Sequence, residues 1–269
     1  MSSCDTAVGI ARFGVNRIGC DFVVGDIHGC FFLLDALLAR LQFDGTRDRL
    51  FSVGDLIDRG PDSERALEWL ARPWFHAIRG NHEQMLLDGL RHGGDAQRLW
   101  QANGGDWFVR LSPAVATDWI HAFEALPLAA EIELGDGRLA ALAHADVPDD
   151  WALVQGRLAH DDQAGITHDQ LMNTLLWARY RAGEVERRRH KSVRWWHRPQ
   201  PVHVRGVDLI YFGHTPMPAP TRCANTRWLD TGAFMGGTLT VAELSMDGAA
   251  WSAATERSVY CCDWQYVDD

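Results

Sequence analysis

Short apolar runs that end in glycine and polar residues recur along this chain. They are typical of buried strands that lead into functional loops. The pattern predicts five such strands, over residues 20–24, 50–53, 74–78, 139–143 and 207–212. Polar segments follow them directly, at residues 25–29, 54–60, 79–83, 144–146 and 213–215. Because ligands gather beyond the carboxyl ends of strands in open α/β sheets, the five ends predict one shared site.

Helical periodicity alternates with these strands up to about residue 125. Residues 31–43 place leucines on one face and predict an amphipathic helix. A second helix is predicted over residues 64–70, with Ser63 as its N-cap and Pro73 at its end. A third is predicted over residues 83–91, directly after Asn81 and His82, so that its positive end faces the site.

From residue 126 onward the pattern predicts mainly strands. Apolar stretches at residues 128–134, 138–143, 209–212, 238–244 and 251–255 carry this expectation. The dipeptides Asp136-Gly137 and Asp247-Gly248 are favourable hairpin turns. With 269 residues and 46% hydrophobic content, we expect a single domain over residues 1–269, with its core at about residues 20–245.

Charge and cysteine content narrow the classes of protein. A formal net charge of −10 argues against general affinity for nucleic acid. No apolar stretch approaches the roughly 18 residues needed to span a membrane, and the first residues lack a secretory pattern. The six cysteines follow no zinc-ribbon spacing, which favours reduced thiols and a cytoplasmic location.

The polar segments have the composition of a metal and phosphate site. Together they supply two aspartates, one asparagine and three histidines, with arginines close by. Mixed oxygen and nitrogen donors of this kind suit a pair of divalent metal ions, and neighbouring cationic groups suit a bound phosphate. The residues therefore predict a metal-dependent phosphatase.

Three of these segments also resemble a known family. In order along the chain they read Gly-Asp-x-His-Gly, Gly-Asp-x-x-Asp-Arg-Gly and Gly-Asn-His-Glu, and similar stretches extend over roughly residues 20–245. This set resembles the phosphoprotein phosphatase superfamily of metal-dependent serine/threonine phosphatases, its phage and bacterial members in particular. The resemblance implies a calcineurin-like metallophosphatase fold of class α/β. Such a fold has a central two-sheet β-sandwich flanked by helices, with the bimetal site at one edge.

The resemblance also implies a role for each motif residue. The implied metal ligands are Asp26, His28, Asp55, Asn81, His144 and His214, with Asp55 bridging two ions. The implied phosphate-binding residues are Arg59, Arg79 and Arg179. His82 would give a proton to the leaving alkoxide, and Asp58 would hold the other nitrogen of its ring. A hydroxide bridging the metals would attack phosphorus in line, and manganese is the expected ion, with iron or zinc as alternatives.

Three classes of function follow from this resemblance. The first is hydrolysis of phosphoserine and phosphothreonine, with phosphotyrosine as a further substrate, in phosphorylated proteins or peptides. The second is a symmetrical diadenosine-tetraphosphate hydrolase, although such enzymes tend to lack an acid at the place of Asp58. The third is a catalytically silent phosphate-binding protein. Such relatives usually lose metal ligands, and here every motif residue is present.

One stretch departs from the family pattern. From Arg179 to Arg205 there are nine Lys or Arg residues and only two acidic ones, Glu184 and Glu186, a local charge of +7. We interpret residues 180–205 as a basic loop insertion. It could be a solvated loop with Trp195 and Trp196 packed on the body of the protein. It could also capture phosphorylated partners, or stack these tryptophans on nucleic-acid bases.

Overall fold

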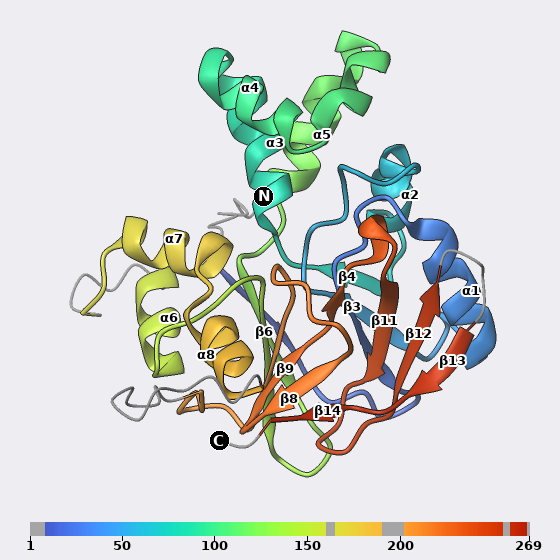
Figure 1. The fold of residues 1–269 in the computed structure, drawn as a ribbon, viewed down its shortest axis with the longest axis vertical. Helices are drawn as coiled ribbons and strands as arrows, with labels where there is room; N and C mark the ends of the chain where they lie inside the picture. The colour runs from blue at the N-terminus through green and yellow to red at the C-terminus, as the bar shows by residue number, and fades with distance from the viewer. Residues whose placement is uncertain (1–8, 160–164, 190–201, 255–258, 268–269) are drawn as a thin grey trace, which may run out of the picture.

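Two β-sheets face each other at the centre of the molecule, and helices cover their outer faces (Figure 1). The computed structural model describes residues 9–159, 165–189, 202–254 and 259–267. The arrangement confirms the predicted α/β metallophosphatase fold with its two-sheet sandwich. Within the described residues, no helix is long and apolar enough to span a membrane.

The first sheet has the strand order β1-β5-β6-β7-β9-β8-β14. Its strands are β1 (Ile10–Phe13), β5 (Ala129–Glu133), β6 (Leu139–Ala143), β7 (Leu209–Phe212), β9 (Thr226–Trp228), β8 (Thr221–Cys223) and β14 (Gln265–Tyr266). β6 and β7 run parallel, with Ala141 opposite Ile210. Their carboxyl ends therefore lie at the same edge of this sheet.

The second sheet has the order β13-β12-β11-β2-β3-β4, and β10 pairs with β11. Its strands are β13 (Val259–Cys262), β12 (Ala250–Ala254), β11 (Thr238–Glu243), β2 (Asp21–Val24), β3 (Arg49–Ser52), β4 (Phe75–Ala77) and β10 (Asp230–Thr231). β2, β3 and β4 are parallel, and Phe51 of β3 pairs with Val23 on one side and His76 on the other.

Successive side chains along each strand point to opposite faces of the sheet, and this divides the core into layers. Val23 faces the space between the sheets and packs there with Leu142 and Tyr211. Its neighbours Phe22 and Val24 face outward and pack under the helices of the second sheet. Both faces of these central strands are buried, which explains why they read as short continuous apolar runs.

The helices are α1 (Phe31–Leu41), α2 (Ala66–Leu70), α3 (Asn81–His92), α4 (Gly94–Ala102), α5 (Ala116–Glu124), α6 (Trp151–Leu158), α7 (His168–Trp177) and α8 (Tyr180–Arg189). Short 3₁₀ helices cover Ser63–Arg65 (η1), Gly105–Arg110 (η2), Pro113–Val115 (η3) and Ala233–Met235 (η4). α1 and α2 pack on the second sheet, and α6, α7 and α8 pack on the first. α3, α4 and α5 project together from one end of the sandwich (Figure 1).

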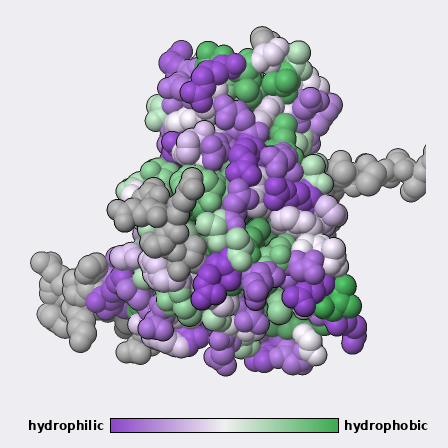
Figure 2. All heavy atoms as spheres, turned by 90° about the vertical axis from the view of Figure 1, so that its right-hand side faces the viewer, coloured by the Kyte–Doolittle hydropathy of each residue, from purple (hydrophilic) through white to green (hydrophobic). Residues whose placement is uncertain are grey.

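The face that includes α1 is largely polar. Figure 2 shows mostly hydrophilic residues there, with apolar residues in separate small groups. The apolar side of α1 is turned inward, with Leu33, Leu34 and Leu37 completely buried. This agrees with the amphipathic helix predicted from the leucine spacing.

Several predicted elements are confirmed with small shifts at their ends. All five strands that lead to polar segments are present as β2, β3, β4, β6 and β7. Asp136-Gly137 connects β5 to β6, and Asp247-Gly248 connects β11 to β12, in antiparallel pairs. The third predicted helix, α3, begins two residues earlier than expected. Asn81 and His82 therefore lie in its first turn.

Two predictions about local structure are wrong. Ser63 is not an N-cap: it is the first residue of η1, and its Oγ accepts a hydrogen bond from Asp58 N at 2.9 Å. The expectation of mainly strands after residue 126 fails where α6, α7 and α8 occur between residues 151 and 189. Their apolar residues pack against the outer face of the first sheet, a tertiary contact that local pattern does not reveal.

The basic stretch is described only in part. α8 occupies Tyr180–Arg189, so the first half of the predicted loop insertion is helical. Its buried Val185 packs in the same core as α6 and α7. Residues 190–201, which include Trp195 and Trp196, lie outside the described residues.

Candidate metal centre

The candidate site lies where the carboxyl ends of the two sheets meet. The loops after β2, β3, β4, β6 and β7 carry six side chains, each at most 8% exposed: Asp26, His28, Asp55, Asn81, His144 and His214. Hydrogen bonds join the two sheets here, since His214 N donates to Asp26 Oδ2 at 2.9 Å and His144 Nδ1 lies 2.8 Å from Val53 O. The structure thus brings together all six residues predicted as metal ligands.

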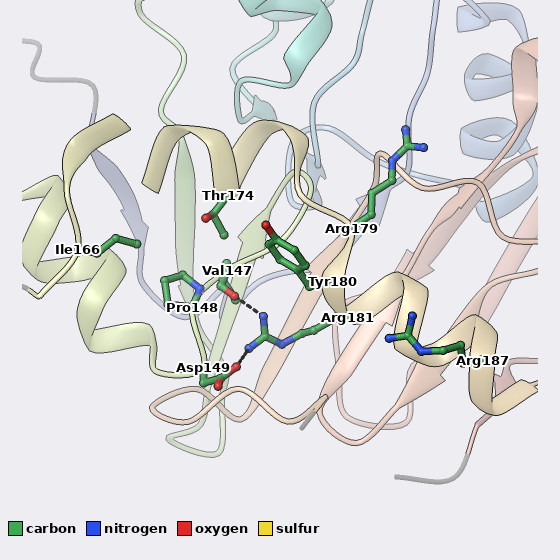
Figure 3. Close-up of a pocket in the computed structure, with 9 residues that line it drawn as sticks. All are labelled: Val147, Pro148, Asp149, Ile166, Thr174, Arg179, Tyr180, Arg181 and Arg187. Atoms are coloured by element: carbon green, nitrogen blue, oxygen red, sulfur yellow. Dashed lines mark hydrogen bonds and ion pairs between the residues drawn. The ribbon is translucent and has the colours of Figure 1, made fainter. Parts of the chain in front are cut away.

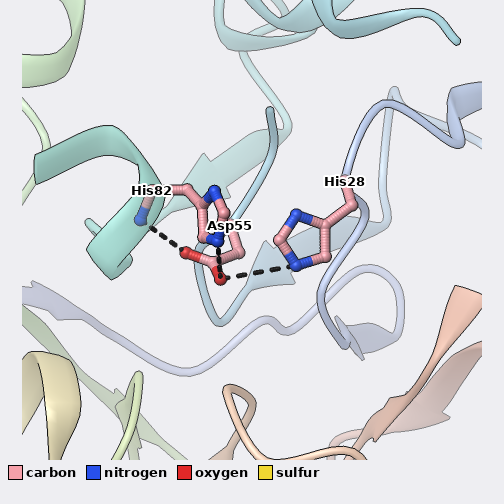
Figure 4. Close-up of side chains that lie close together, drawn as sticks. All are labelled: His28, Asp55 and His82. Carbon is pink, nitrogen blue, oxygen red and sulfur yellow. Dashed lines mark hydrogen bonds and ion pairs between the residues drawn. The ribbon is translucent and has the colours of Figure 1, made fainter. Parts of the chain in front are cut away.

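Asp55 is at the centre of this group. Its Oδ1 is 3.4 Å from His144 Nε2, and its Oδ2 is 3.5 Å from His28 Nε2. Asp55 belongs to two sets of side chains whose donor atoms lie within 4.8 Å of one another, with His28 and His82 in one set and His144 and His214 in the other. Figure 4 shows the first set around the carboxylate. A carboxylate shared by two sets is suited to bridge two ions.

Hydrogen bonds fix the orientation of two imidazoles. His28 Nδ1 lies 2.9 Å from Ile57 O, and His144 Nδ1 lies 2.8 Å from Val53 O. A carbonyl oxygen can only accept, so each Nδ1 carries a proton and each Nε2 presents its lone pair toward Asp55. Burial lowers the pKa of His28 to about 3 and also lowers the pKa of His144. Both rings are therefore neutral at neutral pH, the form that binds metals.

Asn81 adds an amide oxygen to the second set, next to His144 and His214. The amide Oδ1 of Asn81 is 2.8 Å from His144 Nε2 and 2.9 Å from His214 Nδ1. Burial, followed by the proximity of His144, lowers the pKa of His214 to about 3. One amide oxygen and two neutral imidazoles thus converge on one point beside Asp55.

Asp26 provides a test of whether a metal fits. Its Oδ2 accepts a hydrogen bond from His214 N, but its Oδ1 is buried with no hydrogen-bond partner. Burial, followed by the charges of Asp230 and Asp55, raises the pKa of Asp26 well above its usual range. A buried carboxylate oxygen of this kind needs a cation or a proton. The carboxylate, amide and neutral imidazole donors therefore fit divalent metal ions.

Glu83 organises the loops below the site, a role that the sequence interpretation missed. Its completely buried carboxylate accepts hydrogen bonds from Asp55 N at 2.9 Å, Leu56 N at 2.8 Å and Gly80 N at 2.8 Å. These contacts join the loop after β3 to the start of α3. A signal was available, because a glutamate at the third helical position commonly reaches back to the N-cap backbone.

The backbone of the site is strained. Five non-glycine residues here have positive φ: His28, Asp55, Asp58, Arg59 and His214, with values between 45° and 71°. Such conformations cost about 1–3 kcal/mol each and gather at functional sites. They persist here because contacts such as those of Glu83 hold the loops in place.

His82 and Asp58 form a buried pair next to the candidate ligands. His82 Nδ1 lies 2.7 Å from Asp58 Oδ2, and Asp58 is completely buried. Burial alone lowers the pKa of His82, but the carboxylates of Asp55 and Asp58 outweigh it and raise the pKa above its usual value. With Nδ1 held by Asp58, the ring presents Nε2 to the site.

Two tryptophans hold the Asp58 carboxylate, and nothing in the sequence pattern predicted this. Trp107 Nε1 donates to Asp58 Oδ1 at 2.7 Å, and Trp100 Nε1 donates to Asp58 Oδ2 at 3.0 Å. The indoles come from η2 and α4, within the helical projection of Figure 1. Their N–H groups stabilise a buried carboxylate that would otherwise be poorly solvated.

A cavity of about 180 Å³ opens onto this site. It is lined by Asp55, Arg59, Asn81, His82, Asn103, Trp177, Arg179 and His214. Arg59 Nη1 lies 3.0 Å from His28 Nε2, and Arg179 Nε lies 3.1 Å from His214 Nε2. Two of the three predicted phosphate-binding arginines are therefore placed at the cavity. Asn103 and Trp177 line it without having been predicted.

The structure does not bring Arg79 to the cavity, contrary to the sequence expectation. Its guanidinium donates to Glu124 O at 2.8 Å and to Gln84 Oε1 at 3.1 Å. α5 ends at Glu124, and the last carbonyls of a helix need donors and favour a cation. Arg79 thus joins α5 to the start of α3 and is not among the residues that line the cavity.

The comparisons with known proteins agree with this site. Residues 22–218 match the calcineurin-like phosphoesterase family. Serine/threonine-protein phosphatase 1 of Salmonella typhimurium is 37% identical over 226 residues, covering 83% of this chain and 91% of the relative. A symmetrical bis(5'-nucleosyl)-tetraphosphatase of Pseudomonas fluorescens is 29% identical over 168 residues, covering 59% of this chain and 54% of the relative.

Among solved structures, a protein serine/threonine phosphatase from Saccharomyces cerevisiae shares the fold. It is 16% identical and has a TM-score of 0.58, covering 97% of this chain and 84% of that chain. Fold, site and family match together define a metallophosphoesterase. The chain belongs to the calcineurin-like phosphoesterase family, and its predicted relationship to bacterial serine/threonine phosphatases is confirmed.

Gly213→Ala should weaken metal binding. An ideal Cβ at this position would lie 1.9 Å from Asp26 Oδ1 and 2.7 Å from Val53 Cγ2, so Asp26 must move. We expect manganese affinity to fall about 10–100-fold, as when a group supporting a ligand is disturbed. Titration calorimetry of metal-stripped protein measures this. Gly135→Ala is the matched control, because its Cβ would approach only Val15 Cγ1 at 3.8 Å. Unchanged affinity in Gly213→Ala would refute Asp26 as a ligand.

Trp107→Phe should destabilise the fold through Asp58. The substitution removes the indole N–H that Asp58 Oδ1 accepts, while keeping an aromatic ring. Trp69→Phe is the control, because the buried Trp69 Nε1 has no hydrogen-bond partner. We expect the free energy of unfolding in urea at pH 7 to fall by about 1.5–3 kcal/mol more for Trp107→Phe. Equal losses in both variants would mean that the indole donor adds nothing to stability.

Proposed function

We propose that this protein is a metal-dependent protein phosphatase that hydrolyses phosphoserine and phosphothreonine, with phosphotyrosine as a further substrate. The observation that carries the proposal is the buried His82–Asp58 pair, with 2.7 Å between His82 Nδ1 and Asp58 Oδ2, beside the candidate ligands. An alkoxide leaves poorly without a proton, so a positioned acid suits a phosphomonoester. The Salmonella relative named as a serine/threonine-protein phosphatase, similar over 83% of this chain, gives further support.

The metal ligands in this proposal are Asp55 and the five residues gathered around it: Asp26, His28, Asn81, His144 and His214. We propose two manganese ions, because carboxylate and amide oxygens mixed with imidazoles suit this metal. When bound, such ions supply Lewis acidity toward the phosphoryl group and lower the pKa of a coordinated water. Asp55 lies between the two sets and would contribute to both.

Two arginines would bind the phosphoryl oxygens. Arg59 and Arg179 both line the cavity. Arg59 lies near His28 of the first set of candidate ligands, and Arg179 lies near His214 of the second set. Guanidinium groups offer forked donors that match phosphate geometry better than an ammonium group does. Arg79 is left out of this role because its guanidinium is bonded to Glu124 O and Gln84.

His82 would donate the proton to the leaving oxygen. Asp58 accepts from Nδ1, which leaves Nε2 directed toward the cavity. The raised pKa of His82, caused by Asp55 and Asp58 against the effect of burial, favours a ring that still holds a proton near neutral pH. Asp58 acts as a positioning residue, and Trp100 and Trp107 support it.

A symmetrical dinucleoside-tetraphosphate hydrolase is the second candidate. The Pseudomonas relative with this name supports it, although the similarity covers only 59% of this chain. The leaving group of a phosphoanhydride needs less help from a proton than the alkoxide of a phosphomonoester does. The buried acid pair therefore favours the phosphomonoester.

A side-by-side hydrolysis assay tests the substrate class. Metal-stripped protein with added manganese is given a phosphoserine peptide, a phosphotyrosine peptide and diadenosine tetraphosphate. We expect phosphate release from the peptides, with the highest kcat/KM for phosphoserine, and its loss in Asp55→Asn. A higher kcat/KM for the dinucleotide would move the protein to the nucleotide hydrolases.

His82→Asn should separate substrates by their leaving group. Turnover of a phosphoserine peptide should fall about 100-fold or more, the usual contribution of general acid catalysis. Turnover of p-nitrophenyl phosphate should fall far less, because its leaving group departs without a proton. Metal content, measured by mass spectrometry, should not change. The control is His121→Asn, at an exposed position of α5. Equal losses on both substrates, or lost metal, would refute the assignment.

A further inference from the structure

A second, larger cavity adjoins the candidate metal centre. Its volume is about 530 Å³, and it shares Arg179 with the cavity above the ligands. Figure 3 shows its walls, which come from the loop after β6, from α7 and the residues next to it, and from α8. None of the motif residues other than Arg179 lines it. Its lining therefore lies beyond the machinery assigned so far.

The walls of this cavity are largely apolar. Pro148 and Ile166 stand on one side, and the ring of Tyr180 stands on the other (Figure 3). Tyr180 is 72% exposed, although it is a large aromatic residue in the first position of α8. An exposed ring beside aliphatic side chains offers the kind of surface that binds an apolar group.

The charged side chains at the floor of the cavity are paired with one another. Arg181 is 5% exposed and donates to Asp146 Oδ1 at 2.6 Å and to Asp149 Oδ1 at 2.5 Å. At the rim, Arg187 Nη2 lies 2.8 Å from Glu184 Oε2. Arg179, in contrast, makes no ion pair with a carboxylate in the described part of the chain. Positive charge is therefore concentrated at the end of the cavity that borders the metal centre.

Arg181 also fixes this cavity relative to the site. Its backbone N donates to Asp146 Oδ2 at 3.0 Å, and Asp146 follows the candidate ligand His144 by two residues. The segment that carries Arg179 and Tyr180 is thereby tied to the loop after β6. Consecutive Cα atoms are about 3.8 Å apart. Because Arg179 lines both cavities, a peptide whose phosphate lies at Arg179 would reach the larger cavity within about one to three residues.

We propose that this cavity is a substrate subsite that binds an apolar side chain of a phosphopeptide, one to three residues from the phosphorylated residue. The inference rests on the proposed protein phosphatase activity and adds a sequence preference to it. Tyr180, Pro148 and Ile166 contact the apolar side chain, while Arg179 binds the phosphate. The cationic end at Arg179 disfavours a basic residue next to the phosphate.

A nucleoside is the other occupant that the volume admits. Nucleobase sites combine aromatic stacking with polar groups that read the edge of the base. Here the lining offers a single aromatic ring facing aliphatic side chains, and Arg181 and Arg187 are already bonded to carboxylates. The lining therefore favours an apolar amino-acid side chain.

Peptide pairs of equal charge test the subsite. Two phosphoserine peptides differ only in carrying leucines or glycines at the three positions on each side of the phosphoserine. For the wild-type protein with manganese, we expect kcat/KM to be about tenfold higher for the leucine peptide, the scale of discrimination that apolar pockets achieve. Tyr180→Ala, which removes a wall, and Thr174→Phe, which fills the cavity, should both reduce this preference to near unity.

The control is Tyr260→Ala, which removes another exposed tyrosine, 47% exposed and on the second sheet. It should keep the leucine preference. Equal kcat/KM for both peptides with the wild-type protein would overturn the subsite but leave the phosphatase intact. Cleavage of p-nitrophenyl phosphate without cleavage of either peptide would overturn the proposed function itself. A loss in Tyr180→Ala that is larger for diadenosine tetraphosphate than for the leucine peptide would assign the cavity to a nucleoside instead.

Discussion

The buried charge of Asp55 is the constraint around which the site is arranged. The carboxylate is 2% exposed and lies where the loops of two sheets meet. Burial alone would raise its pKa, but the proximity of His144, His82 and His28 outweighs burial and lowers it. The side chain is therefore ionised, and its backbone is held by Glu83 at positive φ. An isolated charge so deeply buried is costly, and the surrounding donors exist to offset that cost.

The same physics makes the site suitable for cations. Asp26, Asp55, Glu83 and Asp230 are buried close together, and burial keeps the imidazoles of His28, His144 and His214 neutral. Burial and then Asp55 raise the pKa of Glu83 to about 7, and burial is also the main cause that raises the pKa of Asp230 to about 6. Divalent ions would relieve this concentration of negative charge, which would couple metal binding to folding.

Distant parts of the chain meet at the His82–Asp58 pair. The helical projection extends beyond the end of the sandwich in Figure 1, yet its indoles bond to Asp58 and through it reach His82. The same region supplies Asn103 to the cavity, and Gly104 approaches the Arg59 backbone too closely for a Cβ. Trp177, at the end of α7, and Arg179, between α7 and α8, also line the cavity. The two sheets thus position the candidate ligands, while the helices on both flanks shape the entrance.

The sequence by itself determined the five central strands, α1 and the positions of the six candidate ligands. These follow from local rules: apolar runs form buried strands, and parallel strands place their ends together. Only the tertiary structure decided that Arg79 turns to the end of α5, that Ser63 bonds to the Asp58 backbone, and that Trp100 and Trp107 hold the Asp58 carboxylate. It also decided that α6, α7 and α8 pack against the first sheet. Each outcome depends on a partner distant in sequence, because a buried donor or acceptor bonds to whichever group the fold brings near it.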